Sequence, residues 1–246
     1  MPEGDTIRRI AAALAPLVGE VVTASSPHPR GRVTGVAAAI DGRRLVDVAT
    51  SGKNLILRFD GGVIVRSHLR MSGRWRVEPS SRPLRGRPWL VIETDAWRAS
   101  QWNGPILAVE RRPGRGFAPD LLAEAVDMDA VVARFRAVDQ STTIGEALVD
   151  QRTVAGIGNL WLAELLWQVE VSPRATLRSV SDAILGEGLE WARQAMLAAV
   201  SDGRPAARVY GRVGRGCPRC GAAIVAFPLG EHQRTMYACP SCQPSP

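Results

Sequence analysis

The chain has 246 residues, and its 31 Lys and Arg residues outnumber 24 Asp and Glu residues, so the formal net charge is +7. This length provides a sizeable core and fits one large domain or two ordinary ones. Most of the basic residues are Arg, whose guanidinium pairs with phosphate and stacks on bases. The composition therefore favours nucleic acid over a membrane surface as the partner, although a soluble protein that is merely basic also fits the charge.

No stretch approaches the roughly 20 apolar residues of a membrane-spanning helix, and the first residues lack the apolar run of a signal peptide. We therefore expect a cytoplasmic protein, associated with the nucleoid when bound to DNA. We also expect a monomer. All four cysteines lie between Cys217 and Cys242. In a reducing compartment, such a cluster indicates a metal site before it indicates disulfides.

The first half of the chain is predicted to be one helix followed by β-structure. The helix begins near residues 5–6, has an apolar face and ends by Gly19. From 21 to about 109 the pattern changes to short β-rich segments, with a hairpin signal at 60–62. The predicted strands are 44–50, 55–59, 63–67, 89–94 and 97–102. This half predicts a β-sandwich or barrel with the first helix packed on it.

The second half is predicted to be helical. The run RRPGRGFAPD at 111–120 is rich in Arg, Gly and Pro and indicates a domain linker. Thr143 and Glu146 have the spacing of a capping box. The glycine-bearing turn before Asn159, with this Asn as the next N-cap, offers backbone N–H groups to a phosphate. An ordinary helical hairpin is the alternative. The predicted helices are 121–138, 142–150, 160–168 and 182–200.

The cysteines form two Cys-x-x-Cys pairs, which is the spacing of a tetrahedral four-cysteine zinc site. The predicted ligands are Cys217, Cys220, Cys239 and Cys242. Four thiolates close the coordination shell, so the zinc is expected to be structural; iron held by four thiolates is the rarer alternative. The metal ties a hairpin with strands near 222–227 and 233–238, and Arg234 is the residue it would present to a DNA groove. A solvated surface Arg is the alternative.

Pro2 and Glu3 form a candidate catalytic pair at the start of the chain. Removal of Met1 leaves Pro2 as a secondary amine, and an α-amino group titrates near ~8, so much of it is neutral and nucleophilic. Attack on a sugar aldehyde gives an iminium ion, which acidifies the neighbouring carbon for elimination. The alternative is that Met-Pro is a common start and Glu3 supports the first helical turn.

Two turns in the β-rich half carry further candidates. Lys53 lies between two predicted strands, where it could contact phosphate or move a proton; a solvated Lys is the alternative. The segment 68–73 places Arg70 beside Met71 in a predicted loop. Enzymes that act on a base take it out of the stack, and Met71 suits a wedge that fills the space left behind. A core Met is the alternative.

Six motifs in order resemble the formamidopyrimidine-DNA glycosylase and endonuclease VIII family of DNA repair enzymes over nearly the whole chain. The motifs are PEGDT at 2–6, SGKN at 51–54, HLRMSG at 68–73, VAGIGN at 154–159, VYGR at 209–212 and the four-cysteine finger with Arg234 five residues before Cys239. The resemblance implies a base-excision-repair glycosylase and AP lyase that acts on damaged DNA, including abasic sites. It also implies one structural zinc and no redox or nucleotide cofactor.

The resemblance assigns catalytic roles by position. Pro2 is implied to be the nucleophile that forms a Schiff base at C1′ of the damaged nucleotide. Glu3 is the implied general acid and base near the opening sugar. Lys53 is implied to assist phosphate contact and proton transfer in β-elimination, and Arg234 to take part in δ-elimination. The implied product is a gapped strand with phosphate at both ends.

The resemblance also assigns DNA contacts. Asn159 and Arg234 are implied to grip phosphates around the lesion. Arg70 and Met71 match positions at which members of the family contact DNA and fill the space that the extruded base leaves in the stack.

The branch of the family is indicated by several segments. The PEGDT start resembles the endonuclease VIII branch, which removes oxidised pyrimidines, whereas the other branch usually begins PELPE. The segment 201–208 is short for the lesion-capping loop of the purine branch, and the Arg-Arg-Phe-Gly turn of that branch is not recognisable at 111–113. HLRMSG is closer to the purine branch.

We therefore expect activity on oxidised pyrimidines. A purine-directed enzyme for 8-oxoguanine or formamidopyrimidine is the alternative within the family. A catalytically silent zinc-containing DNA-binding protein is the main alternative outside it. A zinc-ribbon interaction module without a DNA role leaves the turn before Asn159 and the Arg excess unexplained.

The expected fold is α+β and has three parts. Residues 1–112 form an N-terminal catalytic β-sandwich with the N-terminal helix. Residues 113–206 form a helix-two-turn-helix DNA-binding domain, and 207–246 form a zinc-finger hairpin. DNA is expected to bind in the cleft between the parts.

Overall fold

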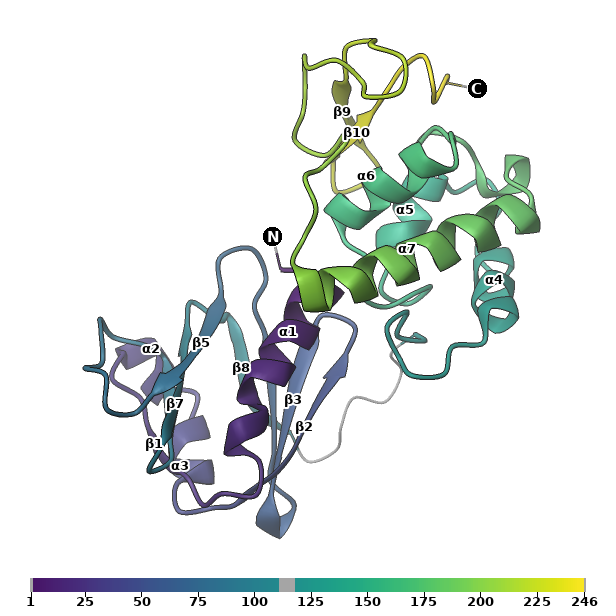
Figure 1. Ribbon diagram of the computed structural model, residues 1–246. Coiled ribbons are helices and arrows are strands. Elements are labelled where there is room, and N and C mark those ends of the chain that lie inside the picture. The colour runs from purple at the N-terminus through teal and green to yellow at the C-terminus, as the bar shows by residue number, and fades with distance from the viewer. Residues whose placement is uncertain (1, 111–117, 246) are drawn as a thin grey trace. The chain divides into compact units, whose positions relative to one another are not determined.

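The computed structural model describes residues 2–110 and 118–245 and divides into two compact units, Met1–Arg115 and Gly116–Pro246 (Figure 1). Each unit is described by itself. The linker predicted at 111–120 falls mostly on residues 111–117, which lie outside the described residues, as does the segment 111–113.

The first unit contains two antiparallel four-stranded sheets, with strand orders β2-β3-β4-β8 and β1-β6-β7-β5. The predicted strands are all present, and the predicted hairpin at 60–62 joins β3 to β4. The strands are β1 Thr23–Ser25, β2 Leu45–Ser51, β3 Asn54–Phe59, β4 Ile64–His68, β5 Arg74–Pro79, β6 Leu90–Glu93, β7 Trp97–Trp102 and β8 Ile106–Glu110.

Helix α1, Gly4–Leu14, packs against β2 and β3 of one sheet and β5 of the other (Figure 1). Its apolar face buries Ile7 and Leu14 in the core of the sandwich. A short 3-10 turn, η1 Ala15–Leu17, ends the helix as predicted before Gly19. The buried face fixes the helix axis, so the residues just before α1 have a defined position on the sandwich.

Several short elements of this unit were not predicted. Strand β5 alternates buried Trp75 with exposed Arg74 and Arg76, as expected for a strand with one buried face. Its charged residues hid this alternation in the sequence. Two short helices, α2 Pro29–Arg32 and α3 Val36–Ile40, also lie in this unit. These two helices are too short for the spacing of apolar residues to identify them in the sequence.

Within residues 118–245, the second unit combines four α-helices and the short 3-10 helix η3 Leu177–Ser179 with one β-hairpin. The helices are α4 Met128–Arg136, α5 Ile144–Val149, α6 Asn159–Gln168 and α7 Asp182–Asp202, and the hairpin strands are β9 Val225–Leu229 and β10 Arg234–Ala238. Cys217, Met236 and Cys239 from the hairpin region are buried in one core with the helices. The hairpin and the helices therefore pack as one body.

Helix α4 is shorter than predicted, because it begins at Met128 and not at Leu121. Leu121 and Leu122 are buried, but they belong to a turn in which Asp120 Oδ1 accepts a hydrogen bond from the Leu122 N–H at 2.9 Å. The apolar spacing that includes Leu121 and Leu122 therefore reflects contact with the core and not a helical backbone. Asp127 caps α4 through the Ala130 N–H at 2.9 Å.

In the part of the chain that the structure describes, we find no helix with the length and apolar character needed to cross a membrane.

Thr143 is the N-cap of α5, as the spacing of Thr143 and Glu146 predicted. The Thr143 hydroxyl accepts from the Glu146 N–H at 3.3 Å and donates to Glu146 Oε2 at 2.6 Å. The Glu146 carboxylate thus meets the Thr143 hydroxyl, whereas a full capping box places it on the N-cap backbone N–H. The Glu146 N–H also donates to the Thr143 carbonyl at 3.1 Å.

Thr143→Ala is expected to lower the free energy of unfolding by about 1 kcal/mol, because it removes the N-cap of α5. Urea denaturation measures the change. Thr142→Ala is the matched control, since the neighbouring hydroxyl does not cap the helix. Equal losses in the two variants would contradict a capping role.

Candidate functional site

Pro2 and Glu3 lie directly before α1, with Glu3 as its N-cap residue. The Glu3 carbonyl accepts the first helical hydrogen bond from Ile7 at 3.1 Å, and its side chain is fully buried. That side chain makes no capping hydrogen bond to α1. The positive end of the helix favours a carboxylate here. Glu3, the residue after Pro2, is therefore buried at the start of α1 without serving as an ordinary side-chain cap.

A cavity of about 320 Å³ opens beside Pro2. Leu69, Gly73 and Trp75 line its other side, so the segment after β4 lies next to the start of the chain. At Gly73 a Cβ atom would lie 2.6 Å from the Leu69 carbonyl oxygen. Only glycine allows the turn to close this tightly beside Pro2.

The turn between β4 and β5 carries Arg70 and Met71. Leu69 is buried, whereas Met71 is 68% exposed, which excludes the alternative of a core Met. Arg70 is exposed and has a φ of +49°, a left-handed conformation that non-glycine residues rarely adopt. Its N–H donates to His68 Nδ1 at 3.1 Å. The turn thus presents an apolar and a cationic side chain to solvent.

Lys53 is the only lysine of the chain and lies on the two-residue turn between β2 and β3. Gly52 has a φ of +56° in this turn. Because Asn54 pairs with His68 across β3 and β4, Lys53 lies at the same sheet end as the His68 side chain.

His68 is partly buried, and its pKa is lowered from 6.5 to about 4. Burial is the largest cause, followed by the positive charges of Arg70, Lys53 and Arg66. The imidazole is therefore neutral at neutral pH, and Nδ1 is the acceptor in its bond with the Arg70 N–H. The sequence placed His68 in a motif but carried no signal of this pKa.

The turn before α6 differs from its predicted geometry in one respect. Gly158 is the N-cap and Asn159 is the first helical residue, whereas Asn159 was predicted at the N-cap. Gly156, with a φ of +105°, donates its N–H to Gln151 Oε1 at 3.1 Å. The Gln151 amide in turn donates to the carbonyls of Val149 and Ile157 at 3.1 and 3.0 Å. Gln151 therefore holds both sides of the turn, a role that sequence reasoning missed.

Asn159 and Arg234 are brought together by a hydrogen bond. Asn159 Nδ2 donates to the Thr235 carbonyl at 2.7 Å, which joins the start of α6 to the residue after Arg234. Arg234 is exposed and is the first residue of β10. The two predicted phosphate contacts therefore occupy fixed neighbouring positions within the second unit.

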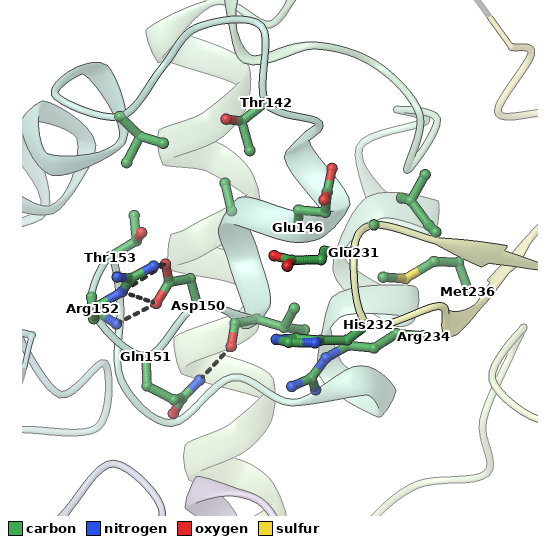
Figure 2. A pocket seen from close by; sticks show the side chains of 15 residues that line it. Thr142, Glu146, Asp150, Gln151, Arg152, Thr153, Glu231, His232, Arg234 and Met236 are labelled. Carbon is green, nitrogen blue, oxygen red and sulfur yellow. Dashed lines mark hydrogen bonds and ion pairs between the residues drawn. The ribbon is translucent and has the colours of Figure 1, made fainter.

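A cavity of about 430 Å³ lies between α5, the turn after it and the loop of the hairpin. Figure 2 shows Arg234 and His232 side by side on one wall, and Arg152 on another. Hydrogen bonds from Arg152 hold the pKa of Asp150 below its usual range, so Arg152 is committed to this ion pair. Arg234 and His232 are the basic groups that the hairpin itself contributes.

The four cysteine sulfur atoms all lie within 4.8 Å of one another. The Sγ atoms of Cys217 and Cys242 are 4.0 Å apart, and those of Cys220 and Cys239 are 3.4 Å apart. A zinc ion bonded to four thiolates at about 2.3 Å places the sulfurs roughly 3.8 Å apart. The cluster therefore fits a tetrahedral metal ion.

The thiol environment is uneven. Burial opposes ionisation of Cys217, but hydrogen bonds from the Trp167 indole and from backbone N–H groups lower its pKa to about 6. Burial and the other three sulfurs raise the pKa of Cys242 to about 12. A divalent cation among the four sulfurs would favour the thiolate form of all of them.

Helix α6 is joined to the segment that precedes the hairpin by Glu164, a role that was not predicted from the sequence. Glu164 is buried, and its carboxylate accepts hydrogen bonds at 2.9 to 3.1 Å from the backbone N–H groups of Arg208, Val209 and Tyr210. The VYGR motif begins with Val209, so the motif pointed to this segment but not to its partner. Glu164 fixes α6 to the segment that leads into the hairpin.

The predicted site residues fall into two groups, each within one unit. Pro2, Glu3, Lys53, Arg70 and Met71 belong to the first unit, where Pro2 shares a cavity with the turn that carries Arg70 and Met71. The second unit holds the remaining candidates, which are Asn159, Arg234, Cys217, Cys220, Cys239 and Cys242.

Two family models match the chain. The Formamidopyrimidine-DNA glycosylase N-terminal domain matches residues 1–105, and the Formamidopyrimidine-DNA glycosylase H2TH domain matches residues 117–209.

Curated proteins match along nearly the whole chain. The chain is 35% identical over 272 residues to the probable endonuclease 8 2 of Streptomyces coelicolor, covering 100% of this chain and 95% of the relative. It is 33% identical over 259 residues to the DNA-(apurinic or apyrimidinic site) lyase Nei2 of Mycolicibacterium smegmatis, covering 99% of each.

A solved structure has the same fold. The formamidopyrimidine-DNA glycosylase of Lactococcus lactis, bound to DNA containing an AP site, superposes with a TM-score of 0.84 at 20% sequence identity. The match covers 99% of this chain and 100% of that chain.

The His68 imidazole is expected to stay neutral down to about pH 5, with a pKa near 4. The unfolded chain binds the proton first, near pH 6.5, so His68 lowers the free energy of unfolding as pH falls from about 6.5 to about 4. NMR titration of the imidazole resonances measures the pKa, with His68→Gln identifying the resonance among three histidines. A His68 pKa of 6.5 or above would contradict the effect of burial and of the three nearby cations.

Proposed function

Because the chain belongs to the formamidopyrimidine-DNA glycosylase family, which comprises DNA glycosylases and AP lyases, we propose that it excises oxidised bases from DNA and cleaves the abasic strand through a Schiff base on Pro2. The observation that carries this proposal is the burial of Glu3 directly beside Pro2 at the start of α1. Base removal and sugar opening require a nucleophile and a proton donor, and Pro2 and Glu3 would supply these two groups from adjacent positions of the chain.

In the proposed first stage, the Pro2 nitrogen, exposed by removal of Met1, attacks C1′ of the damaged nucleotide. Glu3 gives a proton to O4′ as the C1′–O4′ bond breaks, which assists the attack at C1′ and the departure of the base. The N-glycosidic bond breaks, and the base leaves with the bonding electrons and takes up the proton that the Pro2 nitrogen loses, so that the nitrogen and C1′ share an iminium double bond. The fully buried position of the Glu3 side chain next to Pro2 in the sequence supports this role.

In the proposed second stage, the iminium ion draws electrons from the sugar. Loss of a proton from C2′ expels the 3′ phosphate, and loss of a further proton from C4′ expels the 5′ phosphate. Water then hydrolyses the iminium and releases Pro2. Lys53 is the proposed aid to phosphate contact and proton transfer in the first elimination, and Arg234 takes part in the second.

The charges around His68 favour the proposed phosphate contact of Lys53. Lys53, Arg70 and Arg66 all place positive charge near His68. These cations attract a phosphate, and the neutral imidazole adds no further positive charge among them. The exposed Met71 on the adjoining turn is the proposed wedge that fills the space of the extruded base.

Asn159 and Arg234 are the proposed phosphate contacts of the second unit. Asn159 has a second amide hydrogen besides the one donated to Thr235, and Arg234 is exposed next to it along β10. A phosphate held by both would also be favoured by the N-terminal end of α6.

A structural zinc ion is proposed for the four-cysteine cluster. Its ligands would be Cys217, Cys220, Cys239 and Cys242, and it would supply cross-linking of the hairpin and no chemistry, because four thiolates leave no open position. Through the hairpin it fixes Arg234.

Oxidised pyrimidines are the proposed lesions. The PEGDT start and the short segment 201–208 favour them over 8-oxoguanine, and the endonuclease 8 relative is consistent with this preference. A catalytically silent DNA-binding protein is the remaining alternative, and the intact Pro2 and Glu3 count against it.

Borohydride trapping of the untagged protein on duplexes with an abasic site, thymine glycol or 8-oxoguanine tests the proposal. The chain has one lysine, so an adduct can form at the terminal amine or at Lys53, and peptide mass mapping separates the two. We expect the adduct on Pro2, with more adduct on thymine glycol than on 8-oxoguanine, and an adduct that still maps to Pro2 in Lys53→Gln. No adduct on the abasic duplex from protein with a free Pro2 would favour the silent DNA-binding protein.

Glu3→Gln is expected to slow base removal by at least about 100-fold while cleavage of a preformed abasic site persists, because general acid catalysis contributes on this scale. Gel analysis of end-labelled duplexes measures both steps. Glu20→Gln, the same change at an exposed position, serves as the control. Undiminished base removal by Glu3→Gln would exclude Glu3 as the acid.

A further inference from the structure

The four-cysteine cluster lies against the carboxyl end of α6. Trp167, in the last turn of this helix, is 6% exposed, and its indole Nε1–H donates to Cys217 Sγ at 3.3 Å. Cys217 supplies one of the four sulfur atoms of the cluster. A side chain outside the ligand set therefore forms a directed hydrogen bond to a ligand atom.

Two arginines outside α6 pack on the indole ring. The Arg219 guanidinium lies 4.2 Å from the ring centroid, and that of Arg208 lies 5.2 Å from it. Arg219 also donates to the Trp167 carbonyl at 3.1 Å and pairs with Glu170 at 2.9 Å. Because Arg219 lies between Cys217 and Cys220 in the sequence, the first Cys-x-x-Cys pair is fixed to the helix end that carries the indole.

We propose that Trp167 is a positioning residue of the metal site, whose indole N–H orients the Cys217 sulfur and withdraws charge from it when a cation is bound. The inference rests on the proposed metal site and not on the proposed reaction. Hydrogen bonds to ligand atoms orient the ligands and tune the metal, and losing such a partner typically costs 10- to 100-fold in metal affinity.

The same helix carries Asn159 at its other end, where the side chain bonds to the Thr235 carbonyl. Trp167 thus anchors the metal-bound base of the hairpin, and Asn159 anchors the strand that follows Arg234. A loosened Cys217 would free the hairpin at its base while leaving the helix core in place. A role limited to filling space would leave the electronic properties of the metal–sulfur bonds unchanged.

The test compares Trp167→Phe with Trp191→Phe in the full-length protein. Trp191 is a partly buried indole of the same core, on α7, so its loss controls for general loosening. Metal content of the wild type is measured first, and a wild type that binds no metal would overturn both the metal site and this inference. We then expect about ten-fold faster transfer of zinc from Trp167→Phe to a chelator dye, with no change for Trp191→Phe.

Cobalt(II) in place of zinc gives the electronic readout. Removal of the N–H should move the sulfur-to-cobalt charge-transfer band of Trp167→Phe to lower energy, because the sulfur regains electron density. A folded Trp167→Phe protein with the wild-type cobalt spectrum and zinc transfer rate would overturn the inference.

The wild type supplies a measurement that does not depend on how the variant folds. In ¹⁵N-labelled protein, exchange of zinc for cadmium should shift one indole N–H resonance among the seven tryptophans. If no indole resonance moves, the indole does not contact a metal ligand and the inference fails.

Discussion

Three backbone N–H groups in sequence, those of Arg208, Val209 and Tyr210, point at the buried carboxylate of Glu164. A carboxylate removed from water needs such donors, and this one obtains them from the segment that enters the four-cysteine hairpin. The segment cannot move without leaving a buried charge unpaired. The position of the hairpin on α6, and with it that of Arg234, depends on this constraint.

The first unit solves a comparable problem at the start of the chain. A terminal amine on a flexible end would sample many positions, and ordering it at each encounter with DNA would cost conformational entropy. Burial of Ile7 and Leu14 fixes α1 on the sandwich, so Pro2 is ordered before substrate arrives. The tight turn at Gly73 brings the opposite wall of the cavity to it. Both units thus place a candidate site residue by anchoring the element next to it.

Much of the fold follows from local sequence patterns. Apolar spacing located most strands and the later helices, and Thr143 with Glu146 marked the start of α5 correctly. The spacing of the two Cys-x-x-Cys pairs predicted one shared site, and the four sulfurs do lie together. The helix predicted from Leu121 failed because burial of Leu121 and Leu122 comes from a turn packed on the core. A regular spacing of apolar residues indicates contact with a core, but it does not by itself determine the backbone conformation.

The parts of the site that escaped prediction depend on contacts distant in sequence. The low pKa of His68 arises from burial and from charges on neighbouring elements. Glu164 and its donors are 44 to 46 residues apart, and Trp167 and Cys217 are 50 apart. No local pattern reports such pairs. Gln151 is close to its partners, but an exposed-looking Gln in a loop gives no sign that its amide closes a turn.

The distribution of reactive side chains has a practical consequence for attaching probes to this protein. Its single lysine lies on the β2–β3 turn next to His68, and its four cysteines are all in one cluster. Amine-directed dyes and surfaces would couple at Lys53 or at the terminus, and thiol-directed reagents would attack the hairpin. Both common conjugation chemistries would therefore modify a residue of a candidate site. The exposed Cys220 would compete for reagent with any cysteine introduced elsewhere, so an orthogonal handle suits single-molecule work on this chain better than either native group.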